Sequence, residues 1–128
     1  MRCLDATFLI DLVRGDPGAR ERAEEWDRTG EPLSIAAPAL AEVLQGAYFR
    51  GGPSLRVLLD RLSGVEVLAT DATVAEEAGR LGADLLRKGT AVAGVDLLIA
   101  ATVRGSQQIL VTRDRTFSQV PGLVVESY

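Results

Sequence analysis

The sequence contains no histidine and a single cysteine, Cys3. The absence of histidine excludes Ser-His-Asp and Cys-His catalysis and general acid–base chemistry through imidazole. One cysteine without histidine also excludes an ordinary zinc site and an internal disulfide. Any enzyme built on this chain would therefore use carboxylates, hydroxyls and arginines. Its carboxylates would favour hard cations such as Mg²⁺ or Mn²⁺.

Positive charge is also scarce, because the chain has 14 basic against 18 acidic residues and a net charge of −4. This balance is unlike the broad basic surface typical of a nucleic-acid-binding domain. No apolar run approaches the ~20 residues of a membrane-spanning helix. The apolar stretch at the N-terminus is interrupted by Asp5 and Asp11 and lacks a small-residue cleavage site, unlike a signal peptide. We therefore expect a cytoplasmic protein without a membrane segment.

The length of 128 residues suits one compact domain covering residues 1–128, and 47% hydrophobic residues are enough to bury a core. Cys3 lies in an apolar stretch, so we expect it to be a small core residue. Short apolar strands are predicted at 2–5, 32–36, 65–69, 108–112 and 123–127. Helical patterns alternate with them at 7–14, 17–28, 38–49, 55–62, 70–89 and 94–105. This alternation favours an α/β domain with a mostly parallel sheet covered on both faces.

Several residues predict where helices begin and end. Gly15 and Gly89 are typical of helix C-termini, and Asp16 followed by Pro17 is typical of an N-terminus. Thr73 and Glu76 have the spacing of a capping box for the helix within 70–89. These signals place the helix boundaries in the predicted alternation.

Two aspartates follow predicted strands, at the edge of a parallel sheet where ligand sites form. Asp5 closes the first strand, and Asp114 follows the fourth, close to Thr112, Arg113 and Arg115. Either aspartate could instead close a turn or cap the next helix through backbone N–H groups. The residues alone leave both interpretations open.

Asp96 stands at the start of the apolar stretch "GVDLLIAATV", where a helix macrodipole favours an acid as cap or in the first turn. A functional carboxylate is the alternative, because the helix is apolar and should be central. Glu42 falls opposite the apolar face of its helix, so the local pattern indicates an ordinary solvated glutamate. Asp71, in "ATDAT", looks much like Asp5 in "CLDAT", but the capping box accounts for its surroundings. Asp11 is expected to be structural or peripheral.

Four stretches taken together, in order, resemble the PIN-domain nucleases, and within them the VapC-type toxins of toxin–antitoxin systems. They are "LDATFLIDLVRG", "AAPALAEVLQG", "GVDLLIAATV" and "ILVTRDRTFSQVPGLVV", and the similarity spans nearly the whole chain. The resemblance implies a three-layer α/β/α PIN-like fold with roughly five strands. It also implies an acidic catalytic site made of Asp5, Glu42, Asp96 and Asp114.

In this family pattern, Asp5, Asp96 and Asp114 would hold the metal, and Glu42 would bind metal or orient the nucleophile. Thr7 and Thr112 match the accessory hydroxyls. Thr116 departs from the pattern, because many relatives carry a further metal-shell residue there, so the resemblance does not extend to a complete two-metal site.

The activity implied is Mg²⁺- or Mn²⁺-dependent, in-line hydrolysis of an RNA phosphodiester by water whose pKa the cation lowers. Arg113 and Arg115 are candidate phosphate contacts. The expected partners are RNA, a cognate VapB-type antitoxin and a second copy of the chain in a homodimer. Trp26, Tyr48 and Phe49 are candidates to line an antitoxin groove, although we expect at least two of them to pack in the core.

Three other functions are compatible with an α/β domain of this kind. The chain could be a PIN-type RNA-processing nuclease without an antitoxin, or a non-catalytic PIN-like binding module. A phospho-acceptor or phosphatase on a similar sheet is disfavoured, because Thr7 stands where such phosphatases carry a second acid. The paired acids and the lysine of receiver domains are also absent.

Overall fold

The computed structural model describes all residues, 1–128, and contains one five-stranded sheet. The strands run in the order β3-β2-β1-β4-β5, and every neighbouring pair is parallel. Their bounds are Arg2–Leu4 for β1, Leu33–Ala36 for β2, Glu66–Leu68 for β3, Ile109–Val111 for β4 and Val124–Glu126 for β5. All five predicted strands are present, each one or two residues shorter than expected.

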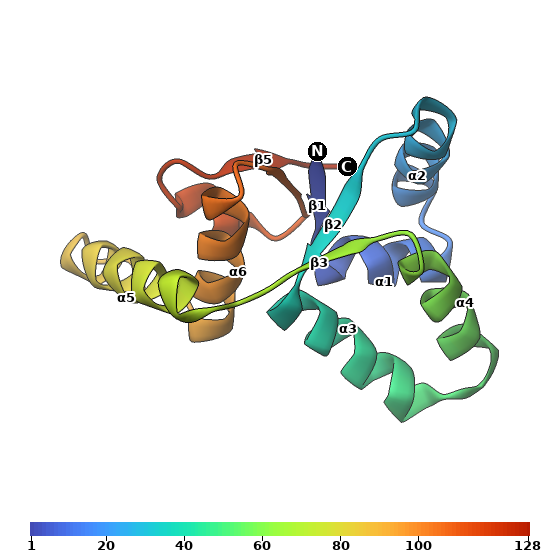
Figure 1. The fold of residues 1–128 in the computed structure, drawn as a ribbon, viewed down its shortest axis with the longest axis horizontal. Coiled ribbons are helices and arrows are strands. Elements are labelled where there is room, and N and C mark those ends of the chain that lie inside the picture. The colour runs from blue at the N-terminus through green and yellow to red at the C-terminus, as the bar shows by residue number, and fades with distance from the viewer.

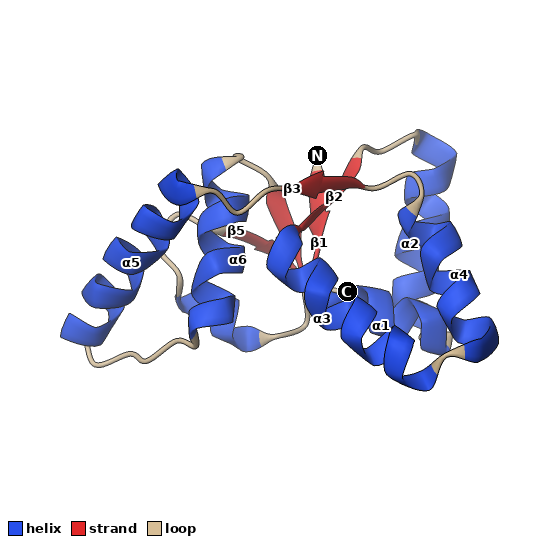
Figure 2. Ribbon diagram, turned by 60° about the horizontal axis from the view of Figure 1, so that its bottom comes forward, coloured by secondary structure: helices blue, strands red, loops and turns tan.

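Six α-helices and one short 3-10 helix connect the strands. They are α1 (Ala6–Arg14), α2 (Pro17–Thr29), α3 (Ala37–Arg50), α4 (Gly52–Leu62), α5 (Ala72–Arg87), α6 (Gly94–Gly105) and η1 (Arg115–Gln119). Helices α5 and α6 lie on one side of the sheet and α1 to α4 on the other (Figures 1 and 2). The predicted three-layer α/β/α fold is confirmed. The 3-10 helix was not predicted.

The strand order reverses direction beside β1. From β1 the chain moves outward through β2 to β3, then crosses back to β4 and β5 on the other side of β1. Because right-handed crossovers place the two sets of helices on opposite faces, a crevice opens between the carboxyl ends of β1 and β4. Residues following these two strands are therefore the natural ligand-binding positions of this sheet.

Most helix boundaries follow the predicted local signals. Gly15 ends α1 with a φ of 84°, which a residue with a side chain rarely adopts. Asp16 caps α2, because its Oδ2 accepts a hydrogen bond from the Ala19 amide at 3.0 Å. Helix α4 begins at Gly52, three residues before the prediction, because the chain needs only Gly51 to break away from α3.

The capping-box prediction for α5 was wrong. The N-cap is Asp71, whose Oδ1 accepts a hydrogen bond from the Val74 amide at 3.0 Å, and Thr73 already lies inside the helix. Both residues are good N-caps, and the chain uses the earlier one, which gives α5 two more helical residues. Gly89 follows the end of α5 with a φ of 81°, as expected for a helix stop.

The core lies between the sheet and the helices on both faces. Cys3 is fully buried, in agreement with its predicted role. Helix α6 is central, because five consecutive residues from Ile99 to Val103 are buried. Helix α5 crosses close to α6, where a Cβ added at Gly82 would lie 2.7 Å from Leu97 Cδ1. This close packing fixes the start of α6, next to Asp96.

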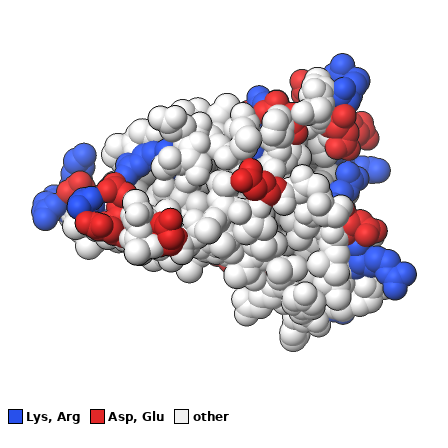
Figure 3. All heavy atoms as spheres, in the orientation of Figure 1, with Lys and Arg blue, Asp and Glu red and all other residues white.

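The surface carries basic and acidic side chains interspersed rather than separated. On the face drawn in Figure 3 they gather toward the two ends of the molecule and leave the middle largely uncharged. Of the three aromatic residues considered above, only Trp26 is buried, whereas Tyr48 is 62% and Phe49 is 91% exposed. The expectation that at least two would pack in the core was wrong, because the end of α3 projects beyond the core. None of the helices has the length and apolarity needed to cross a membrane.

Candidate active site

The carboxyl ends of β1 and β4 bring Asp5 and Thr112 together. Leu4 and Val111 are register partners in the parallel pair, and the Asp5 amide donates to the Val111 carbonyl at 3.0 Å. The backbone therefore continues its pairing with β4 one residue past the end of β1. Both side chains are buried, at 3% exposure for Asp5 and 1% for Thr112.

Asp5 is oriented by hydroxyls rather than by a helix terminus. Its Oδ2 accepts hydrogen bonds from Thr112 Oγ1 at 2.7 Å and from Thr7 Oγ1 at 3.1 Å. Although Asp5 occupies the N-cap position of α1, its side chain makes no capping hydrogen bond. The capping interpretation was wrong for this residue, and Asp5 Oδ1 makes no hydrogen bond within the chain. The two threonines thus fix one oxygen and leave the other available.

Asp114 is attached to the same group of side chains. Its amide donates to Thr112 Oγ1 at 3.0 Å, and its Oδ1 accepts from the Thr116 amide at 2.9 Å. Asp114 therefore caps η1 with one oxygen and keeps Oδ2 free of hydrogen bonds within the chain. Thr112 links the two aspartates, which follow different strands.

Asp96 lies in the first turn of α6 and is half-buried. The N-cap is Ala93, and no side chain caps this helix, so Asp96 is not the cap but an acid of the first turn, the other structural role that the sequence allowed. Burial raises the pKa of the Asp96 carboxyl, and the negative charges of Asp114 and Asp5 raise it further. Asp96 is thus near both aspartates at the strand ends.

Glu42 on α3 completes the group. Its pKa is raised by partial burial and then by the charges of Asp5, Asp96 and Asp114. The helical wheel correctly placed Glu42 away from the core-facing stripe of α3, because the residue is exposed. Helix α3 packs beside α6, however, so this exposed side borders the crevice. The structure therefore brings all four predicted acids together.

The donor chemistry of these four acids fits a hard divalent cation. Partial burial, and after it the mutual repulsion of the acids, raises the pKa values of Glu42 and Asp96, and no arginine forms an ion pair with any of the four. No three of them converge closely enough to enclose one ion. Mg²⁺ does not require that, because it usually keeps several waters and is held by one or two carboxylates plus substrate phosphates. Free oxygens remain on Asp5 and Asp114 for this purpose.

The two arginines beside Asp114 differ in their surroundings. Arg113 is half-exposed, and its guanidinium contacts Asp11 at 3.2 Å and Asp16 at 3.7 Å. Arg115 is exposed on η1 and forms no salt bridge. Asp11 is peripheral to the four acids, as expected, because it is the partner of Arg113 and of the Tyr128 hydroxyl. The ion pairs direct Arg113 toward α1.

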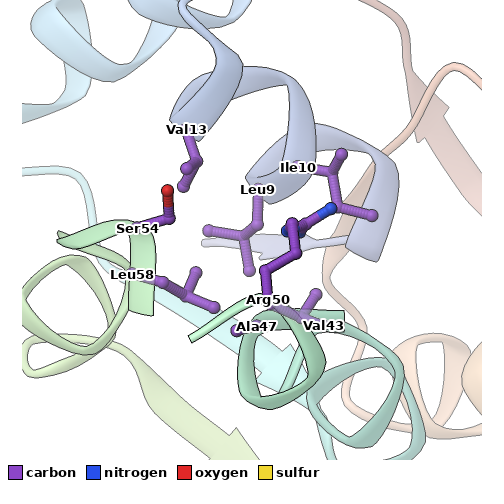
Figure 4. Close-up of a pocket in the computed structure, with 8 residues that line it drawn as sticks. All are labelled: Leu9, Ile10, Val13, Val43, Ala47, Arg50, Ser54 and Leu58. Atoms are coloured by element: carbon purple, nitrogen blue, oxygen red, sulfur yellow. The ribbon is translucent and has the colours of Figure 1, made fainter. Parts of the chain in front are cut away.

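A second feature is an apolar groove between α1, α3 and α4, which the sequence did not indicate. Figure 4 shows side chains from the three helices around it, with Leu9, Leu58 and Arg50 among them. Its eight lining residues are Leu9, Ile10, Val13, Val43, Ala47, Arg50, Ser54 and Leu58. Apolar residues on the flanks of three amphipathic helices were the only available signal.

Comparison with known proteins identifies the architecture. The family model described as "PIN domain" matches residues 2–123. The chain is 31% identical over 129 residues to the tRNA(fMet)-specific endonuclease VapC of Shigella flexneri, covering 98% of this chain and 96% of that protein.

Solved structures of the same family superpose closely. DNA-bound VapBC from Salmonella typhimurium matches with a TM-score of 0.84 and 27% identity, covering 98% of this chain and 96% of that one. VapBC2 from Rickettsia felis, bound to a promoter DNA fragment, matches with a TM-score of 0.83 and 23% identity, covering 99% and 98%. Because its identity is only 23%, the match to the Rickettsia felis structure shows a shared fold and nothing further.

Proposed function

The chain belongs to the PIN domain family, and from that premise we propose that it is a metal-dependent endoribonuclease and the toxin of a toxin–antitoxin pair. The observation that carries the proposal is the grouping of Asp5, Glu42, Asp96 and Asp114 around the crevice where the strand order reverses, with Thr112 linking two of them. The relatives named as VapC endonucleases support the same activity.

We propose Mg²⁺ or Mn²⁺ as the cofactor, held by Asp5, Asp96 and Asp114 directly or through water, with Glu42 as a further ligand or as the group that orients the nucleophile. When bound, the cation would neutralise the crowded carboxylates and stabilise negative charge on the phosphate under attack. Thr112 and Thr7 keep Asp5 in one orientation, so little reorganisation is needed when substrate binds.

RNA binding by an acidic chain is compatible with this site, because a cation between carboxylates and phosphate removes their repulsion. Arg115 is the freer of the two candidate phosphate contacts. Arg113 would reach a phosphate only by leaving Asp11 and Asp16. The site itself does not select a sequence, so the shape of the crevice and its loops would choose the RNA.

We propose that the antitoxin docks on the apolar groove between α1, α3 and α4. Six of its eight lining residues are hydrophobic. The likeness to VapC and to a solved VapBC complex supports a toxin with an antitoxin over a processing nuclease without one. A homodimer is expected as well, and light scattering of the purified chain would test it.

RNA cleavage is the direct test of the activity. We expect the wild-type chain to cleave a mixed RNA pool, with initiator tRNA included, in the presence of Mg²⁺ or Mn²⁺. EDTA and Asp96→Asn should abolish cleavage, whereas Asp71→Asn should not, because Asp71 only caps α5. No cation-dependent cleavage of any RNA would refute the nuclease. Harmless expression in cells, together with cleavage in vitro, would favour the processing nuclease over the toxin.

A further inference from the structure

Tyr128 is joined to the loop that carries Asp114 through a group of three polar side chains. The Tyr128 hydroxyl donates to Asp11 Oδ2 at 2.6 Å, and Arg113 Nε contacts the same oxygen at 3.2 Å. The Arg113 guanidinium also lies over the Tyr128 ring, 5.2 Å from its centroid. Each member of this group, the Tyr128–Asp11–Arg113 brace, contacts the other two.

The brace is anchored in the core. The Tyr128 ring meets the ring of Phe8 edge-on, with centroids 5.0 Å apart, and Phe8 is only 1% exposed. Partial burial and the hydrogen bond to Asp11 raise the pKa of the Tyr128 hydroxyl well above its ordinary value. The hydroxyl therefore remains a donor throughout the physiological pH range.

Arg113 connects this anchor to the site because it lies between Thr112 and Asp114 in the chain. Its amide points to Thr7 Oγ1 at 3.5 Å, and the next amide, of Asp114, donates to Thr112 Oγ1. Fixing the Arg113 side chain from outside restricts the backbone on which Asp114 is carried. Other arginine pairs, such as Arg87 with Asp84, join exposed neighbours on one helix and contribute little.

We propose that Tyr128 and Asp11 are positioning residues of the active site, which hold Arg113 so that the Asp114 carboxylate faces Asp5 and Asp96. The inference rests on the proposed function for its catalytic consequence. The structural part of the inference is that the brace keeps the loop at residues 112–116 ordered. The order of this loop can be measured by hydrogen exchange without RNA. The brace also assigns Arg113 a role as a loop anchor.

The test is Tyr128→Phe, which removes one hydroxyl and keeps the ring against Phe8. The matched control is Tyr48→Phe, at the only other tyrosine, which is 62% exposed. We expect amide hydrogen exchange at Arg113, Asp114 and Thr116 to become about tenfold faster in Tyr128→Phe, as for loss of one charge-assisted hydrogen bond. Exchange in α5 should be unchanged in both variants. Equal exchange at the three amides in both variants would overturn the brace.

Asp11→Asn provides a second, independent variant, with Asp84→Asn as its control because Asp84 pairs only with Arg87 on α5. We expect Asp11→Asn to weaken Mn²⁺ binding severalfold and to lower kcat for RNA cleavage with KM unchanged. A purely structural role would lower the melting temperature and leave Mn²⁺ affinity and kcat as in Asp84→Asn, which would contradict the inference. If wild-type protein cleaves no RNA, the proposed function fails, and exchange and Mn²⁺ affinity still decide the brace.

Discussion

Thr112 Oγ1 donates a hydrogen bond to Asp5 Oδ2 at 2.7 Å, across 107 residues of sequence. Thr112 Oγ1 also accepts a hydrogen bond from the Asp114 amide at 3.0 Å. One buried hydroxyl therefore orients a carboxylate that follows β1 and the backbone that carries a carboxylate following β4. The geometry of the candidate site and the stability of this edge of the sheet therefore depend on the same hydroxyl.

Replacing Thr112 with valine should destabilise the fold. The change keeps the branched shape but removes one of the two hydrogen bonds to Asp5 Oδ2 and leaves the Asp114 amide without its partner, at a cost of about 1–3 kcal/mol. Urea unfolding of the cation-free protein would measure this loss. Thr29→Val is the control, because the Thr29 hydroxyl bonds only to carbonyls of its own helix. Equal losses in the two variants would contradict a special role for Thr112.

The crowding of the acids predicts a pH dependence. The pKa of Glu42 is higher in the folded chain than in the unfolded one, because of partial burial and then the charges of three aspartates. The folded state then binds more protons between the ordinary and the raised pKa, so the free energy of unfolding falls as pH rises through that interval. Glu42→Gln should remove this loss when no cation is present.

In EDTA, Glu42→Gln should therefore be more stable than wild type at neutral pH. The advantage should vanish below about pH 4, under the ordinary pKa of a glutamate. Denaturant unfolding at the two pH values measures it, with Glu24→Gln on the exposed face of α2 as the control. An advantage independent of pH would show that the glutamine acts through something other than charge.

The corrected cap of α5 can be tested by two alanine substitutions. Asp71→Ala should lower the free energy of unfolding by about 0.5–2 kcal/mol, because the Val74 amide loses its partner. Thr73→Ala should have a much smaller effect, since Thr73 lies within the helix and makes no capping hydrogen bond. Thermal unfolding of both variants compares them. A larger effect at Thr73 would show that Thr73, and not Asp71, is the N-cap of α5.

The crossing of α5 and α6 predicts opposite behaviour for two glycines on α5. Gly79 has open space around its missing Cβ, so Gly79→Ala should stabilise the helix by roughly 0.5–1 kcal/mol. Gly82→Ala should lose that gain, because the new Cβ would lie 2.7 Å from Leu97 Cδ1 and Leu97 follows Asp96. Chemical unfolding of the pair measures the difference. An equal gain at both positions would mean that α6 adjusts without cost.

The fold was largely predictable because its signals are local. Alternating apolar strands and amphipathic helices, with helix stops such as Gly15, gave every strand and all six α-helices. The choice between Asp71 and Thr73 as a cap was not predictable, since both residue types suit the position. The end of α3 was also misjudged, because burial of Tyr48 depends on how far that helix projects beyond the sheet.

The site was predictable only in part, and for a physical reason. Asp5 and Asp114 follow adjacent strands, so topology alone predicts their meeting. Glu42 does not follow a strand. A helical wheel distinguishes residues that face the core from residues that face away from it, but it does not show whether an outward-facing residue borders a crevice or open solvent. Only the family resemblance selected Glu42. The brace on Arg113 was invisible in sequence, because it joins Asp11 to Tyr128 over 117 residues.

Cation binding measured by calorimetry tests most directly whether the four carboxylates act as one site. With Mn²⁺, wild type and Asp71→Asn should bind alike, while Asp96→Asn and Asp114→Asn should each bind at least about tenfold more weakly. Glu42→Gln should weaken binding if it is a ligand and leave it unchanged if it orients the nucleophile. Undiminished binding by Asp96→Asn and Asp114→Asn would contradict the account.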